Sequence, residues 1–183
     1  MSLTPKKFFL VKGKGFSMNS ELLSFEQALR DAGIEKYNLV NVSSIIPPYC
    51  IEITNEEGLK QLNAGQIIYS VLSKISSKEM NELICSSIGV AKPTNQEFYG
   101  YLSEQHSIGE NPNQVGEMAE NLAAEMLATT LGIHFNPESN YDKKKEIFKI
   151  NDKIIETKNK TESIAVRMQD EWATAITAAI FIL

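Results

Sequence analysis

Two adjacent hydroxyl side chains, Ser43 and Ser44, lie inside an apolar run that ends at Pro47 and Pro48. A serine hydroxyl can attack the carbonyl of the residue before it, which exchanges the peptide bond for an ester. Hydrogen-bond donors near that carbonyl would stabilise the oxyanion that forms. β-Elimination then cuts the chain after Ser43, and the remainder of Ser44 hydrolyses to a pyruvoyl group. The pair therefore permits the chain to make a carbonyl cofactor from its own serine.

Adjacent serines alone do not predict this chemistry, because Ser76-Ser77 and Ser86-Ser87 also occur in the chain. A strand whose hydroxyls bond to neighbouring strands explains such pairs equally well, since a buried hydroxyl without a partner costs about 1–3 kcal/mol. Three features distinguish Ser43-Ser44. Apolar residues flank it, a rigid diproline stop follows it, and two amide side chains that could donate hydrogen bonds, Asn38 and Asn41, precede it.

The stretch DAGIEKYNLVNVSSIIPP, residues 31–48, resembles the processing site of the pyruvoyl-dependent arginine decarboxylases. The likeness continues in order along the chain. SFEQAL at 24–29 is similar to the helix before that site, and FYGYLSEQHS at 98–107 is similar to the strand that carries the catalytic glutamate. ESIAV at 162–166 and the alanine-rich end WATAITAAIFIL are similar to the C-terminal pattern of the family.

The resemblance implies that one domain, residues 1–183, cuts itself into a β chain of 1–43 and an α chain of 44–183. Ser44 would become the pyruvoyl group, so neither a metal nor pyridoxal phosphate is expected. Asn38 matches an asparagine of the family that is implicated in self-cleavage. The resemblance also implies a homotrimer of cleaved protomers, with active sites between neighbours.

Glu104 matches the acid that protonates the α-carbon of the substrate in this family. On a strand it shares a face with Leu102 and Gly100, because side chains alternate. A carboxyl group on an apolar face has a raised pKa and stays protonated closer to neutrality. From the residues alone, the polar stretch after Glu104 favours a solvated strand end, and the resemblance favours the catalytic role.

Selecting arginine requires a carboxylate that pairs with the guanidinium group. Glu26 stands where the family typically has an aspartate, so the charge is kept but moved by one methylene group. Leu22, one helical turn earlier, would line the same pocket. The favoured interpretation is conversion of L-arginine to agmatine and CO2 for polyamine biosynthesis. Three alternatives remain: the same chemistry on another amino acid, an unprocessed, non-catalytic homologue that serves as a binding or assembly subunit, and a plain amino-acid-binding domain.

The bulk composition is that of an ordinary globular protein, with 43% hydrophobic and 22% charged residues among 183. The net charge of −5 argues against a nucleic-acid or anionic-membrane partner. No apolar run approaches the ~18 residues of a membrane span, and the N-terminal apolar run is too short for a secretory signal. We therefore expect a cytoplasmic protein. Cys50 and Cys85 show no metal-ligand spacing and are expected to be free thiols.

Hydrophobic periodicity predicts the elements that position these residues. Helices are expected at 20–32, with Ser20 as the cap, and from Asn111-Pro112 to Gly132, with Met118 and Met126 in its buried stripe. Loops are expected at 13–20 and 54–65, and a hairpin around 151–152. Strands are expected at 8–11, 37–46, 66–75, 83–91, 98–106, 163–168 and 173–183. This content predicts an α+β fold with mostly antiparallel sheets, and the resemblance implies a four-layer αββα sandwich.

Overall fold

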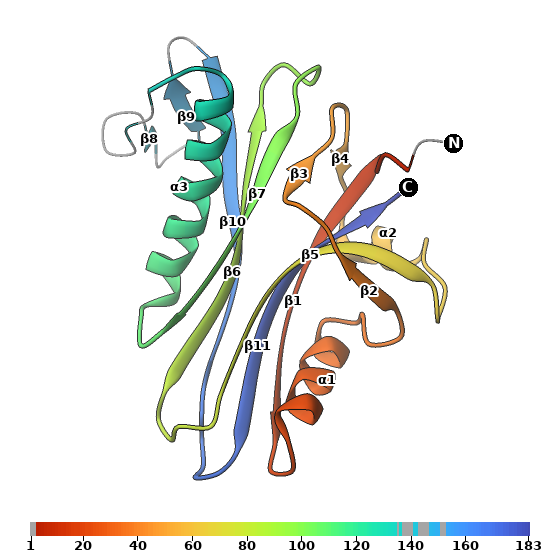
Figure 1. Cartoon of the computed structure of the whole chain (residues 1–183), viewed down its shortest axis with the longest axis vertical. Helices are drawn as coiled ribbons and strands as arrows, with labels where there is room; N and C mark the ends of the chain where they lie inside the picture. The colour runs from red at the N-terminus through yellow and green to blue at the C-terminus, as the bar shows by residue number, and fades with distance from the viewer. Residues whose placement is uncertain (1–2, 135, 137–140, 143–146, 151–152) are drawn as a thin grey trace.

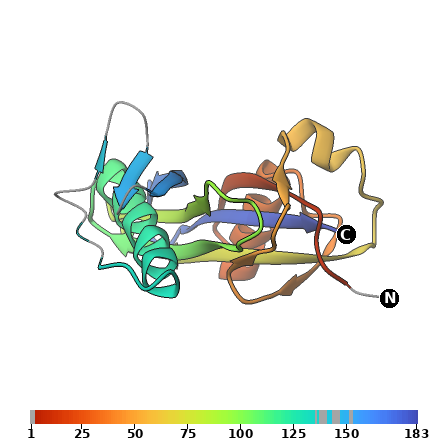
Figure 2. The ribbon, with the colours of Figure 1, turned by 90° about the horizontal axis from the view of Figure 1, so that it is seen from above.

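The computed structural model describes residues 3–134, 136, 141–142, 147–150 and 153–183. Two β-sheets pack face to face, and one long helix covers the outer face of each sheet (Figure 1). Seen from above, the two helices lie well apart, with strands of both sheets between them (Figure 2). These layers confirm the prediction of an α+β sandwich.

The first sheet has the strand order β2-β5-β11-β1-β4 and is covered by helix α1 (Glu21–Asp31). Its long strands pair antiparallel, whereas β2 joins β5 and β4 joins β1 in parallel. The alanine-rich C-terminal strand lies in the middle of the sheet, where small apolar side chains are buried on both faces. The strands are β1 (Lys7–Ser17), β2 (Asn38–Asn41), β4 (Ile51–Glu52), β5 (Ile67–Ser77) and β11 (Trp172–Ile182).

The second sheet has the order β3-β7-β6-β10-β9-β8, is antiparallel throughout, and is covered by helix α3 (Pro112–Thr130). In the predicted hairpin, Ile150 pairs with Lys153, while the turn residues 151–152 are outside the described part of the chain. The strands are β3 (Ile45–Ile46), β6 (Leu83–Pro93), β7 (Gly100–Ile108), β8 (Tyr141–Asp142), β9 (Ile147–Ile150) and β10 (Lys153–Ala165).

Strand β1 shows how one run of apolar residues serves two cores. Phe8 and Leu10 point into the core between the sheets, and Phe9 and Val11 pack beneath α1. Because strand side chains alternate between faces, a strand buried on both sides must be apolar at every position. The continuous run of apolar residues at 8–11 therefore marks a strand that lies inside a layered fold.

The predicted loop at 13–20 is wrong over its first half, because β1 continues to Ser17. Gly13 and Gly15 are not turn residues. A Cβ atom at Gly13 would lie 2.2 Å from the Ala28 carbonyl oxygen, and one at Gly15 would lie 2.2 Å from that of Ser24. The two glycines allow α1 to approach the strand closely, a requirement of packing that the local pattern does not reveal.

Two other predicted boundaries differ from the structure. The expected loop at 54–65 contains a short helix, α2 (Asn55–Leu59), which begins with a capping box between Thr54 and Glu57. The expected single strand at 37–46 is two strands in different sheets, β2 and β3. The chain crosses from one sheet to the other between them, and Ser43-Ser44 lies in that crossing.

Helix α3 is rotated relative to the predicted stripe. Met118 is 48% exposed, so its predicted core position is wrong, and Met126 is only partly buried. Small residues such as Ala119 and Ala123 face the sheet instead. The reason is close packing, because a Cβ atom at Gly89 of β6 would lie 2.1 Å from the Ala119 carbonyl oxygen. Large side chains do not fit in so narrow a gap.

Candidate active site

Ser43 and Ser44 form the bridge between the two sheets. Before them, the Val42 N–H donates to the Ser70 carbonyl oxygen of β5 at 2.9 Å. After them, the Leu102 N–H of β7 donates to the Ser44 carbonyl oxygen at 2.8 Å. The chain therefore changes sheets within two residues. Ser43 is exposed and Ser44 is partly buried. The sequence predicted that the pair lies within a strand, and this prediction is wrong, because the pair lies between β2 and β3.

The backbone makes a tight turn at the pair. The Ile45 N–H donates to the Ser43 carbonyl oxygen at 2.8 Å, which makes Ser44 the central residue of a three-residue turn. Ile46 is 2% exposed in the core between the sheets and anchors the far side of the turn. Among the described residues, no hydrogen-bond partner is recorded for the hydroxyl group of Ser43 or of Ser44.

Glu104 lies beside this turn. It follows Leu102 by two positions on β7, and Leu102 is the residue that bonds to Ser44. The Glu104 carboxyl also accepts a hydrogen bond from the backbone of Leu72, on β5 of the other sheet. Glu104 thus lies on the face of β7 that is turned toward the other sheet, and Leu102, on the same face, is completely buried.

Partial burial raises the pKa of the Glu104 carboxyl above its ordinary value, because desolvation disfavours the charged form. The hydrogen bond from Leu72 and the nearby His106 act in the opposite direction but do not cancel the effect of burial. The side chain is still accessible to solvent. An accessible carboxyl group that holds its proton to a higher pH is suited to donate that proton to a bound molecule.

Asn38 lies away from the serine pair in the single chain. It begins β2, five positions before Ser43, and its Nδ2 donates to the Gly65 carbonyl oxygen at 2.8 Å. The nearer asparagine, Asn41, accepts a hydrogen bond from the Ser70 hydroxyl at 3.1 Å. Each of these two bonds engages its side chain within the first sheet. The role of Asn38 in cleavage stays a prediction.

Glu26 and Leu22 lie on α1, which packs on the face of the first sheet turned away from the second. The Glu26 carboxylate pairs with Arg30 one helical turn later. Leu22 is 72% exposed, whereas Ala28 and Ala32 lie on the buried side of this segment. The single chain does not bring these two residues to Ser44, and their role in substrate binding stays a prediction.

A hollow of about 380 Å³ opens beside the crossing. Ser43 lines this hollow, but Ser44 and Glu104 do not. Its walls are mostly apolar and come from the N-terminal segment, the crossing, β3 and the first sheet; they include Leu3, Val42, Ser43, Ile45, Tyr69 and Phe181.

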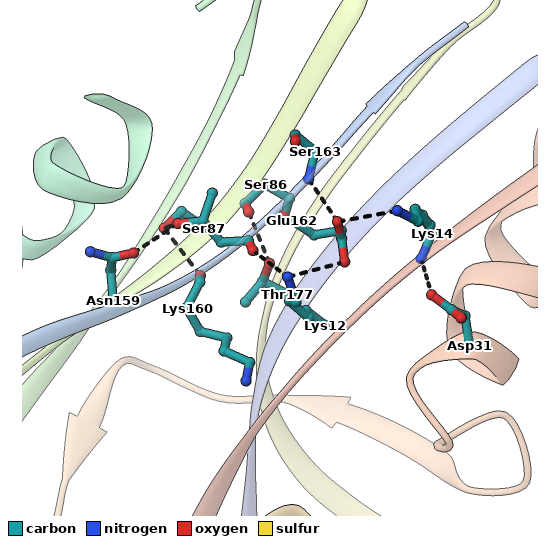
Figure 3. A network of polar contacts seen from close by, with 11 residues as sticks. Lys12, Lys14, Asp31, Ser86, Ser87, Asn159, Lys160, Glu162, Ser163 and Thr177 are labelled. Carbon is teal, nitrogen blue, oxygen red and sulfur yellow. Dashed lines mark hydrogen bonds and ion pairs between the residues drawn. The ribbon is translucent and has the colours of Figure 1, made fainter. Parts of the chain in front are cut away.

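The other two serine pairs lie in regular strands with their hydroxyls engaged. Figure 3 shows Ser86 and Ser87 of β6 inside a network of polar contacts. The Ser86 hydroxyl donates to the Ser73 carbonyl oxygen at 3.0 Å, and the Ser87 hydroxyl donates to that of Lys160 at 3.2 Å. Ser76 and Ser77 of β5 are also bonded, to Thr174 and Glu82 respectively. These pairs fit the structural explanation.

Sequence reasoning proposed the serine pair and the glutamate as site residues but did not find the groups that hold them in place. Those groups are the backbone amides of Ile45, Leu72 and Leu102. Every residue except proline has such an amide, so no residue type signals it. The register of β3 against β7 places the amides of Ile45 and Leu102, and the packing of one sheet on the other places that of Leu72.

Within the described ranges, no group of three or more His, Cys, Asp or Glu side chains is arranged to hold a metal ion. In the same residues, no helix has the length and apolar character needed to cross a membrane. Cys50 and Cys85 are both buried free thiols, as predicted.

Comparison with known proteins gives one consistent result. The family model described as "Pyruvoyl-dependent arginine decarboxylase" matches residues 7–183. A protein of Chloroherpeton thalassium named "Probable pyruvoyl-dependent arginine decarboxylase" is 50% identical over 182 residues, which cover 100% of both chains. One of Chlorobaculum tepidum with the same name is also 50% identical, covering 100% of this chain and 99% of its own. "Pyruvoyl-dependent arginine decarboxylase 2" of Methanosarcina acetivorans is 46% identical and covers 98% of each chain.

Proposed function

Because the chain belongs to the pyruvoyl-dependent arginine decarboxylase family, we propose that it cuts itself between Ser43 and Ser44 and converts L-arginine to agmatine and CO2. The products of cleavage are a β chain of 1–43 and an α chain of 44–183. The reaction serves polyamine biosynthesis in the cytoplasm. One observation carries the proposal: the Leu102 amide binds the carbonyl of Ser44, and Glu104 follows two positions later on the same strand.

The residues at the crossing fit a pyruvoyl group made from Ser44. The hydroxyl that must react is not held by another described group, and an amide contacts each of the two carbonyl oxygens that flank the serine α-carbon. The first of these amides belongs to Ile45 and the second to Leu102. A pyruvoyl group supplies a ketone that holds an amino acid and accepts the electron pair left behind by CO2.

The chain's own residues supply binding and proton transfer. Glu104, whose pKa is raised by burial, donates a proton to the α-carbon after CO2 has left. The Leu102 N–H fixes the carbonyl oxygen of residue 44, so that the reacting centre keeps its orientation toward Glu104. The Glu26 carboxylate binds the guanidinium group of the substrate, and Leu22 packs against its aliphatic part.

The positions of Glu26 and Leu22 support an assembly of several copies. Both residues are accessible on the outside of α1, away from Ser44 of the same chain. A second copy can bring its α1 to the crossing of the first, which would place a carboxylate and an apolar side chain near the serine. We therefore propose a homotrimer whose active sites lie between neighbouring protomers, with Asn38 contributing to cleavage.

The first test is the intact mass of the purified protein under denaturing conditions. Two fragments, 1–43 and 44–183, are expected, and the larger should carry a pyruvoyl group in place of its N-terminal serine. Release of CO2 from carboxyl-labelled arginine is then compared with release from lysine, ornithine and aspartate. A preference for one of the other three would keep the chemistry and change the substrate. A single chain of full mass after long incubation would contradict the proposal and favour a non-catalytic subunit.

A further inference from the structure

The carbonyl that must be attacked during cleavage already carries a hydrogen bond. It is the Ser43 carbonyl, and its oxygen accepts the Ile45 N–H at 2.8 Å. We propose that this amide is the oxyanion donor for self-cleavage. The inference rests on the proposed cleavage at Ser43-Ser44 and assigns a specific group to its hardest step.

The register of β3 explains why the Ile45 amide points back along the chain. Ile45 pairs with Tyr101 and Ile46 with Gly100. In an antiparallel pair, successive residues direct their N–H and C=O groups alternately toward and away from the partner strand. Since the Ser44 carbonyl faces Leu102 of β7, the next N–H, that of Ile45, faces the other way. It is therefore not used by the ladder and is free to bind the Ser43 oxygen.

Both sides of the turn are fixed before any reaction begins. The Val42 N–H binds the Ser70 carbonyl oxygen on the upstream side, and Ile46 is buried in the core between the sheets on the downstream side. Pro47 follows, and its ring restricts the backbone further. A donor that is already in place needs no reorganisation when the negative charge forms, which is the condition under which oxyanion donors are most effective.

The step in which this donor acts is an acyl shift. The Ser44 Oγ forms a bond to the Ser43 carbonyl carbon, and the carbonyl oxygen becomes the oxyanion that the Ile45 N–H stabilises. The carbon–nitrogen bond of the Ser43–Ser44 peptide then breaks, and the hydroxyl proton ends on the Ser44 nitrogen. Elimination then passes the Cα proton of Ser44 to water and breaks the bond between Cβ and Oγ, which releases the Ser43 carboxylate. One water converts the remaining enamine to the ketone with loss of ammonia.

A donor at the carbonyl is not sufficient by itself. The Ser86 carbonyl oxygen also accepts a hydrogen bond, from the Thr177 hydroxyl at 2.9 Å. There, however, the Ser87 hydroxyl that would attack is bound to Lys160 and Thr161, and both serines are completely buried. At the crossing, the Ser43 carbonyl oxygen has a donor, the Ile45 N–H, and the attacking Ser44 hydroxyl has no hydrogen bond to any described residue. The combination distinguishes the reactive pair.

The test removes the Ile45 N–H without changing a side chain. Replacing Ile45 by its α-hydroxy acid analogue converts the 44–45 amide to an ester, which has no hydrogen to donate. A matched control replaces Val42 by its α-hydroxy acid, which removes the N–H bonded to Ser70 in the same segment. Chains are made by cell-free translation with a pulse of labelled amino acid. Cleavage is followed by intact mass, so that simple ester hydrolysis after residue 44 gives a distinct fragment.

Loss of one oxyanion donor typically slows a reaction by about 10²–10³-fold. We expect cleavage between 43 and 44 to slow by this factor in the Ile45 ester and by less than about tenfold in the Val42 ester. Thermal unfolding of both esters in a Ser44→Ala background should show similar losses of stability, which separates chemistry from folding. Equal cleavage rates for the two esters would overturn the inference. Failure of the all-amide chain to cleave would instead contradict the proposed function.

Discussion

Two serine pairs of this chain have the same side chains and opposite surroundings. Ser86-Ser87 lies in the middle of β6, fully buried, with each hydroxyl bonded to a backbone carbonyl of another strand. Ser43-Ser44 lies where the chain leaves one sheet for the other, with one residue exposed and one partly buried. Its backbone groups are bonded, and its hydroxyls have no recorded partner among the described residues.

The comparison predicts that the reactivity of a serine pair depends on which of its polar groups the fold supplies with hydrogen-bond partners. In β6 the fold satisfies the hydroxyls, which removes the nucleophile and stabilises the sheet. At the crossing, as in β6, carbonyl oxygens accept hydrogen bonds, here from the amides of Ile45 and Leu102, but the two hydroxyls have no hydrogen bond to any described residue. A carbonyl that accepts a hydrogen bond is more easily attacked, and an unbonded hydroxyl is available to attack it.

The largest expected effect is that of Ser44→Ala, which removes the nucleophile. We expect no cleavage and no decarboxylation, because the chain then has no source of a pyruvoyl group. Intact mass gives the first result and CO2 release gives the second. Turnover by an uncleaved Ser44→Ala chain would show that activity does not depend on Ser44, and the contrast between the two serine pairs would then have no catalytic meaning.

Glu104→Gln should separate the two functions of the crossing. In the proposed cleavage Ser44 and the backbone amides act without Glu104, so this variant should still give the two fragments. Turnover should fall by about 10²–10⁴-fold, because a glutamine cannot donate the proton. Intact mass and the rate of CO2 release, measured on the same sample, check both outcomes. Glu110→Gln, an exposed carboxylate after the end of the same strand, is a control for the loss of charge.

The raised pKa of Glu104 also predicts a dependence of stability on pH. Since the folded chain holds this proton more tightly than the unfolded chain, the native state binds more protons between the ordinary value of 4.5 and the raised pKa. The free energy of unfolding should therefore fall as pH rises through that window. Urea unfolding at several pH values should show that the free energy of unfolding falls less with rising pH in Glu104→Gln than in the unchanged chain. An equal fall in both proteins would show that another group causes the pH dependence.

A smaller effect is expected for Glu26→Gln. The variant keeps the shape of the side chain and loses the charge that would bind a guanidinium group. Because a hydrogen bond to a charged group contributes about 1.5–3 kcal/mol, we expect KM for arginine to rise by about 10- to 100-fold, with cleavage unaffected. Glu56→Gln is the matched control, since Glu56 makes the same type of pair with Lys60 on the edge of α2. Equal KM values for the two variants would exclude Glu26 from the substrate site.

The smallest catalytic effect is expected for Ser87→Ala. It removes a hydroxyl that donates to Lys160 and shares a hydrogen bond with Thr161 at 2.8 Å. Losing these two part-buried hydrogen bonds should lower the free energy of unfolding by about 1 kcal/mol, since Thr161 keeps its bond to Asn159. Thermal unfolding should detect this loss, and intact mass should show normal cleavage at Ser43-Ser44. A loss of cleavage in a folded Ser87→Ala chain would assign chemistry to the buried pair.

Much of the fold follows from local patterns. The caps at Ser20 and Asn111, the alternation along β1 and the apolar central strand β11 are all visible in residue types, because capping and alternation act between near neighbours. The errors arise where distant segments meet. Gly13 and Gly15 have the pattern of turn residues, but the structure uses them to let α1 pack closely on β1. Met118 has the spacing of a core residue, but it is exposed because α3 packs closely on Gly89 through its small residues.

The sequence by itself determined the family, which the model match over residues 7–183 shows, and it offered the serine pair and Glu104 as the candidates for its chemistry. Only the tertiary structure decided that Ser43-Ser44 lies in a crossing between sheets, and that Ser86-Ser87 lies within a strand. The physical reason is that the deciding groups are backbone amides. Their residue types carry no signal, and their direction depends on strand register, which long-range pairing fixes.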